Sequence, residues 1–97
     1  MATDTEKAAS LKDQGNAAFK ACKWDQAVDF YTQAIALNPT EKTFYTNRAQ
    51  AQLKLEAYGL AINDATKAIE LDNAFTKAYY RRAVANTAVL RLSLIHI

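Results

Sequence analysis

Apolar residues recur every three or four positions along most of this chain, which is the spacing of one face of an α-helix. The clearest set comprises Ala27, Phe30, Tyr31, Ala34, Ile35 and Leu37. Residues 13–20 fit the same pattern, with Leu11, Ala18 and Phe19 as the nearby apolar positions. Few runs are rich in β-branched residues, so the pattern predicts helices rather than a sheet.

Turn-forming residues divide this pattern into five helices. A turn is predicted at residues 21–23, and Asn38-Pro39 ends the second helix because a residue before proline avoids the helical region. Thr40 is expected to cap the third helix. The later helices are predicted at residues 41–55, at residues 57–71 and, after a break at Asp72-Asn73, from about residue 74 onward.

The segments are related by an internal repeat. TQAIALNP, which starts at Thr32, returns as TKAIELDN from Thr66, 34 positions later. We call this shift of 34 residues the repeat offset. The same offset pairs Trp24 with Tyr58, Ala27 with Ala61, Tyr45 with Tyr79, Arg48 with Arg82 and Ala49 with Ala83. The alanines allow helices to approach closely, and the aromatic residues Trp24, Tyr31, Tyr45, Tyr58 and Tyr79 are expected to fill the wider gaps between helices.

A helix pair that repeats at this offset, with Gly15, Ala27, Tyr31, Ala34 and Pro39 at these places, resembles the tetratricopeptide repeat (TPR). The resemblance covers about residues 8–90. It implies an all-α fold, a right-handed solenoid of antiparallel helix pairs with two full repeats and the first helix of a third. We expect a flexible N-terminus at residues 1–7 and a truncated TPR domain at residues 8–91, with repeats at about 8–41, 42–75 and 76–91.

Composition and charge limit the possible partners. The 97 residues suffice for one small domain, and a formal net charge of +2 without a basic block argues against nucleic acid. No stretch approaches the ~18 apolar residues of a membrane span, and the N-terminus lacks the apolar core of a secretory signal. Cys22 is the only cysteine, which fits a reducing compartment. We therefore expect a cytoplasmic or nuclear location and no membrane association.

Polar residues on the first helix of each pair are the candidate binding residues, because those helices line the concave groove of such arrays. Lys12 and Asn16 are four positions apart, as are Lys77 and Arg81, so each pair lies on one face of its helix. Asn47 is related to Arg81 by the repeat offset and occupies the same place in its repeat. Ammonium, guanidinium and amide donors together suit the carboxylates of a peptide C-terminus.

The set Lys12, Asn16, Asn47, Lys77 and Arg81 resembles the two-carboxylate clamp of TPR co-chaperones. That clamp holds the acidic C-terminal tail, ending Glu-Glu-Val-Asp, of heat-shock protein 90 and heat-shock protein 70. The resemblance implies those partners, and the alternative is a TPR scaffold whose polar helix face binds no chaperone. Arg48 and Arg82 face about 100° away from their neighbours Asn47 and Arg81, which predicts a role in packing or outer charge.

LEAYGLAINDATKAIELD followed by KAYYRRA resembles the N-terminal module of the protein phosphatase 5 family of serine/threonine phosphatases. In that family the repeats inhibit a catalytic domain with two metal ions until the groove is occupied. This chain carries no catalytic or cofactor-binding set of its own, so any enzyme activity would belong to the parent protein. The alternative is a stand-alone co-chaperone adaptor.

The last six residues, LSLIHI, do not continue the third repeat and include the only histidine, His96. They are what the transposase end sequence of sequencing libraries encodes when it is translated. Our interpretation is that residues 92–97 are an adaptor-derived tail and that the native sequence ends at about Arg91. An independent transcript from the same source would test this interpretation.

Overall fold

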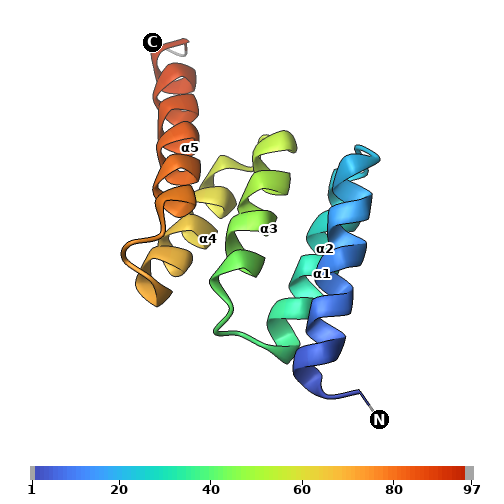
Figure 1. Ribbon diagram of the computed structural model, residues 1–97. Coiled ribbons are helices and arrows are strands. Elements are labelled where there is room, and N and C mark those ends of the chain that lie inside the picture. Colours follow the sequence, from blue (N-terminus) through green and yellow to red (C-terminus); the bar gives the residue numbers. More distant parts are fainter. Residues whose placement is uncertain (1, 96–97) are drawn as a thin grey trace.

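The structure, a computed structural model, describes residues 2–95. This part of the chain forms the helices α1 (Asp4–Lys20), α2 (Trp24–Leu37), α3 (Lys42–Lys54), α4 (Tyr58–Leu71) and α5 (Thr76–Ile95). Each helix packs against the next, and α3 also contacts both α1 and α5. Figure 1 shows two helix hairpins, α1–α2 and α3–α4, followed by α5. The predicted all-α fold of helix pairs is confirmed.

Two predicted features near helix N-termini are wrong. Residues 4–7 belong to a helix rather than to a flexible segment, because the Thr3 hydroxyl caps α1 by accepting the Glu6 backbone N–H at 3.2 Å. The cap of α3 is Glu41, whose carboxylate accepts the Thr43 backbone N–H. Thr40 lies one position too early for this role, and its hydroxyl instead donates to Asn38 Oδ1 at 3.3 Å.

The last helix is longer than its counterpart in the preceding repeat. α3 ends at Lys54, whose equivalent in the third repeat is Ala88, yet α5 continues to Ile95. In Figure 1 its C-terminal turns project past the ends of α3 and α4. Residues 92–95 of the LSLIHI segment are thus helical, and His96 and Ile97 lie outside the described residues. The proposed adaptor origin of this segment stays a prediction.

Small residues at repeated positions form the contacts between helices. Five alanines of the repeat pattern, Ala27, Ala34, Ala49, Ala61 and Ala68, are completely buried. The aromatic residues fill the adjoining spaces: Tyr45 is 6% exposed and its hydroxyl donates to the Pro39 carbonyl at 2.7 Å. Tyr79 makes the equivalent bond to the Asn73 carbonyl at 2.8 Å. Its side chain is nevertheless 42% exposed, so the expectation that Tyr79 fills a gap between helices is wrong.

Arg48 joins three helices across the repeat boundary. Arg48 of α3 donates from Nε and Nη2 to the two carboxylate oxygens of Asp64 in α4, at 2.7 Å each. Its Nη1 donates to the hydroxyl of Thr32 in α2 at 3.1 Å. The hydrogen bonds to Asp64 raise the pKa of Arg48 above its usual value. This bidentate geometry confirms the packing role predicted for Arg48.

Each of the two hairpin turns contains one residue in the left-handed backbone conformation. Cys22 has a φ of 60° and Glu56 a φ of 61°, and the repeat offset relates the two positions. In both turns the next backbone N–H bonds back into the helix, Lys23 to the Ala18 carbonyl and Ala57 to the Gln52 carbonyl, at 2.9 Å each. This is the Schellman closure that glycine usually occupies, so both side chains add strain.

We predict that Cys22→Gly and Glu56→Gly each raise the free energy of unfolding by about 0.5–1 kcal/mol, because glycine removes the steric cost of positive φ. The matched control is Ala21→Gly, whose φ of −83° gives glycine no advantage. Urea unfolding followed by circular dichroism measures the change. A Cys22→Gly protein that is no more stable than Ala21→Gly would contradict the prediction.

Candidate functional site

The five predicted site residues lie on the three first helices of the repeats. Lys12 and Asn16 are on α1, Asn47 is on α3, and Lys77 and Arg81 are on α5. Because α3 contacts both α1 and α5, the three helices lie side by side. Asn16 and Asn47 are in direct contact, whereas Arg81 lies against α3 without reaching Asn47 within hydrogen-bond distance.

Asn16 is held in one orientation by two donors. Its Oδ1 accepts the hydroxyl of Tyr31 at 2.6 Å and the Nδ2 of Asn47 at 3.5 Å. Since its carbonyl oxygen is engaged, the amide nitrogen of Asn16 remains as a donor for a ligand. Tyr31 belongs to α2, so a second helix of the repeat positions a side chain of the first.

Gly15 makes this arrangement possible. A Cβ at Gly15 would lie 2.5 Å from Cε1 and 2.8 Å from Cδ1 of Tyr31, which is closer than atoms can pack. The Tyr31 ring therefore lies directly over the backbone of α1, and its hydroxyl reaches Asn16, the next residue along the chain. Tyr31 was expected only to fill a gap, and its role in positioning Asn16 was missed. A glycine inside a helix, directly before a candidate binding residue, was the available signal.

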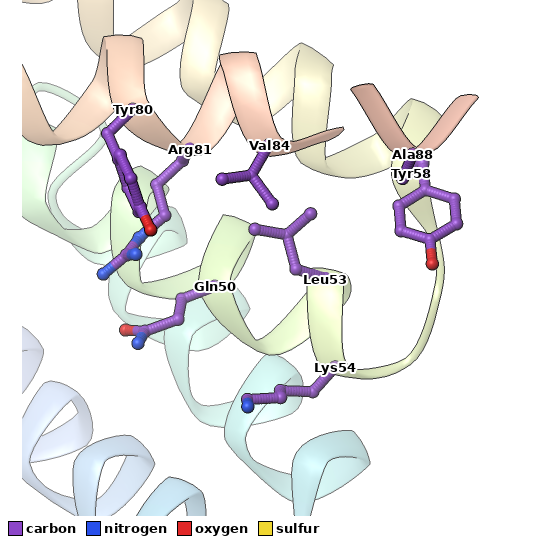
Figure 2. A pocket seen from close by; sticks show the side chains of 8 residues that line it. All are labelled: Gln50, Leu53, Lys54, Tyr58, Tyr80, Arg81, Val84 and Ala88. Carbon is purple, nitrogen blue, oxygen red and sulfur yellow. The ribbon is translucent and has the colours of Figure 1, made fainter. Parts of the chain in front are cut away.

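A cavity of about 340 Å³ lies beside Arg81, between α3 and α5. Figure 2 shows its lining, with Leu53 and Val84 pointing toward one another and the Tyr80 ring beside the guanidinium of Arg81. The guanidinium carbon is 5.5 Å from the centre of that ring, within the range of a cation–π contact. Arg81 Nε is buried and has no hydrogen-bond partner in the described part of the chain. No acceptor therefore engages this nitrogen before a ligand arrives.

None of the basic side chains of the site forms an ion pair within residues 2–95. Across residues 2–95 the ion pairs are Lys42–Asp72 and Arg48–Asp64, and neither involves a candidate site residue. Lys77 is exposed, while Lys12 is half-buried and borders a smaller cleft that also includes Glu41 and Thr43. The five residues thus supply three cations and two amides on adjacent helices, and donors of these kinds complement carboxylates.

A metal site and a membrane-spanning helix find no support in the described residues. Within residues 2–95, no three His, Cys, Asp or Glu side chains come together in a way that would hold a metal ion. No helix in that range is both long and apolar enough to cross a bilayer. The site is thus defined by donors for hydrogen bonds and ion pairs, arranged along a helical repeat.

Such a fold and site define a helical-repeat domain with a donor-rich ligand surface. Models of the tetratricopeptide repeat match residues 8–41 and 43–75. The Arabidopsis OM64 TPR domain is 43% identical with a TM-score of 0.89, and the match covers 91% of this chain and 73% of that one. The chain belongs to the tetratricopeptide repeat family.

Two further groups of relatives are informative. The chain is 65% identical, over 91% of its length, to serine/threonine-protein phosphatase T of Aspergillus oryzae, and 50% identical, over 87%, to human serine/threonine-protein phosphatase 5. It spans only 18% and 17% of those proteins. The first TPR of Spaghetti (RPAP3) bound to the HSP90 peptide SRMEEVD is 38% identical with a TM-score of 0.89, and the match covers 94% of this chain and 72% of that one.

We predict that Gly15→Ala lowers the free energy of unfolding by roughly 1–3 kcal/mol, because the new methyl group displaces the Tyr31 ring from a packed site. Gly59→Ala is the matched control, since a Cβ there meets nothing within 4 Å and alanine favours the helix. Thermal unfolding of both proteins measures the difference. Similar stability changes for the two substitutions would contradict the close approach at Gly15.

The Tyr31 hydroxyl also predicts a dependence on alkaline pH. Burial raises the pKa of Tyr31 to about 12, from an ordinary value of 10.0. The folded state therefore holds this proton more tightly, so its contribution to stability is complete below about pH 10 and is lost as the pH rises toward 12. The free energy of unfolding should fall more steeply over that interval in the unaltered protein than in Tyr31→Phe. Parallel slopes for the two proteins would contradict the prediction.

Proposed function

We propose that this domain binds the acidic C-terminal tail of heat-shock protein 90 or heat-shock protein 70 through Lys12, Asn16, Asn47, Lys77 and Arg81. The observation that carries the proposal is the free donor surface on α1, α3 and α5, in which no basic site residue is paired with a carboxylate within residues 2–95. The structural relatives support it. The RPAP3 domain was solved with an HSP90 peptide, and the TPR2B domain of yeast Sti1, 41% identical to this chain, with an Hsp70 peptide.

The contacts divide the site into two parts. Asn47 already donates a hydrogen bond to Asn16. Together with Lys12, these residues offer amide and ammonium donors to one carboxylate. We assign that carboxylate to the C-terminus of the peptide. Lys77 and Arg81, on one face of α5, would receive a carboxylate from an acidic side chain. Each well-formed charge-assisted hydrogen bond contributes about 1.5–3 kcal/mol, so two carboxylates suffice for selective binding.

The cavity beside Arg81 fits an apolar residue of the same peptide. Leu53, Val84 and Ala88 supply apolar walls next to the proposed contact between Arg81 and an acidic side chain. The peptide SRMEEVD in the RPAP3 structure has a methionine directly before its two glutamates. A flexible thioether side chain suits such a cavity, which would add selectivity for the residues upstream of the acidic end.

We further propose that the complete protein is a cytoplasmic or nuclear serine/threonine phosphatase, with this domain as its targeting and autoregulatory part. The identity of 65% with phosphatase T supports this assignment. The catalytic domain, with its two metal ions, would lie outside these 97 residues.

A stand-alone co-chaperone adaptor is the second candidate. The similarity to the RPAP3 and Sti1 domains favours such an adaptor, because these domains are similar repeats outside the phosphatases. The peptide site would be the same in both cases. A full-length coding sequence separates the two, because only the phosphatase proposal requires a catalytic domain after the repeats.

We predict that a peptide ending Glu-Glu-Val-Asp binds the 97-residue chain, and that binding weakens when its C-terminus is amidated or when salt is added. Lys77→Ala and Arg81→Ala should each cost about 2 kcal/mol, because each leaves a carboxylate without its partner. Lys67→Ala is the matched control, since Lys67 is an exposed lysine on α4 outside the site. Isothermal titration calorimetry measures all four proteins. Equal binding of the acid and amide peptides would contradict the carboxylate clamp and favour the alternative, a TPR scaffold without such a clamp.

A further inference from the structure

Lys42, the first residue of α3, is poorly placed for the stability of its own helix. A cation in the first turn opposes the helix dipole. The repeat pattern does not account for the lysine either, since Ala8 and Thr76 stand at this place in the other repeats. The contacts of Lys42 lie instead toward the loop between α4 and α5.

The ammonium group of Lys42 contacts both ends of that loop. Its Nζ forms an ion pair with Oδ2 of Asp72, the C-cap residue of α4. It also lies 4.8 Å from the centre of the ring of Phe75, the residue directly before α5. The other carboxylate oxygen of Asp72 accepts the backbone N–H of Ala74 at 3.1 Å. One lysine of α3 thus holds the loop at residues 72–75 from outside.

These contacts make more than an isolated surface ion pair, which stabilises a fold little. The side chains of Lys42 and Asp72 are only 36% and 32% exposed. Phe75 packs against a buried cluster that includes Tyr45 of α3 and Ala78 of α5. The ammonium of Lys42 therefore borders the apolar contact between α3 and the start of α5.

The loop before α5 lacks two features that hold the loop before α3. The ring of Pro39 fixes its own φ, and the repeat offset places Asn73 there in the second loop. Glu41 caps α3 with its carboxylate, and its equivalent is Phe75, whose side chain has no acceptor. The contacts of Lys42 compensate for both losses, because they tie the loop to the helix beside which α5 must lie.

We propose that Lys42 is a positioning residue for the peptide site, which sets α5 against α3 through Asp72 and Phe75 and so places Lys77. Lys77 follows Phe75 by two residues, so a shift of the loop moves its ammonium group. When the loop is released, only a fraction of the molecules hold α5 in the binding arrangement, and the apparent affinity falls by that fraction. This inference rests on the proposed peptide binding.

The hold on the loop is tested without peptide, by amide hydrogen exchange followed by NMR. Lys42→Met removes the charge and keeps an unbranched side chain over Phe75. The N–H groups of Ala74 and Ala78, both bonded to loop residues, should then exchange about fivefold faster. Lys42→Arg should restore slow exchange. The matched control is Lys67→Met, which removes the same charge from an exposed position on α4 and should change neither amide.

The effect on the site is measured with the peptide ending Glu-Glu-Val-Asp. Lys42→Met should weaken its binding about fivefold, and Lys42→Arg should restore it. In a chain that also carries Lys77→Ala, Lys42→Met should change the affinity less than about twofold, because the group that it places is absent. Asp72→Asn should also weaken binding, although on charge alone the loss of a carboxylate would favour an acidic peptide.

Three results would overturn the inference. The first is unchanged amide exchange in Lys42→Met. The second is a fivefold loss of affinity that persists in the Lys77→Ala chain, since Lys42 would then act on the peptide by itself. The third is tighter binding by Asp72→Asn. Failure of the proposed function has a different signature, because the unaltered chain would then bind the acid and amide peptides equally, and the role of Lys42 in the site would fail with it.

Discussion

The close approach of α1 and α2 at Gly15 is the constraint on which the rest of the site depends. Without a Cβ at this position, the Tyr31 ring lies against the backbone of α1. Only from there does its hydroxyl reach Asn16, which in turn contacts Asn47 of the next repeat. A single packing contact inside the first hairpin thus fixes the orientation of an amide of the proposed site. The hydrogen bond from Asn47 to Asn16 then connects the two repeats.

Neighbouring side chains on the first helices perform separate tasks. Asn47 donates to Asn16 of the proposed site, while Arg48 binds Asp64 and Thr32 and so joins three helices. Arg81 lines the cavity between α3 and α5, and Arg82 lies beside the ring of Tyr79. Successive residues of a helix differ by about 100° in direction, so each adjacent pair can serve recognition and assembly at once. This division explains why two arginines stand side by side without competing for one partner.

Much of the fold could be predicted from the sequence, because the apolar residues recur at helical spacing and whole segments recur at the repeat offset. Apolar spacing indicated the helices, and the repeat offset indicated the pairing of segments and the helices that carry the site. The errors lie where one local contact decides the outcome. Glu41 rather than Thr40 caps α3, and Thr3 extends α1 to Asp4. The role of Tyr31 depends on a distance between two helices, which a one-dimensional pattern does not contain.

The two halves of the site differ in how firmly the fold holds them. Asn16 accepts hydrogen bonds from both Asn47 and Tyr31, and the helices of Asn16 and Asn47 are covered by α2 and α4. Lys77 and Arg81 lie on α5, which has an exposed face that includes Tyr79. The Nε of Arg81 has no hydrogen-bond partner in the described residues. A peptide that bridges both halves would therefore hold one end between covered helices and the other end on a helix with an exposed face.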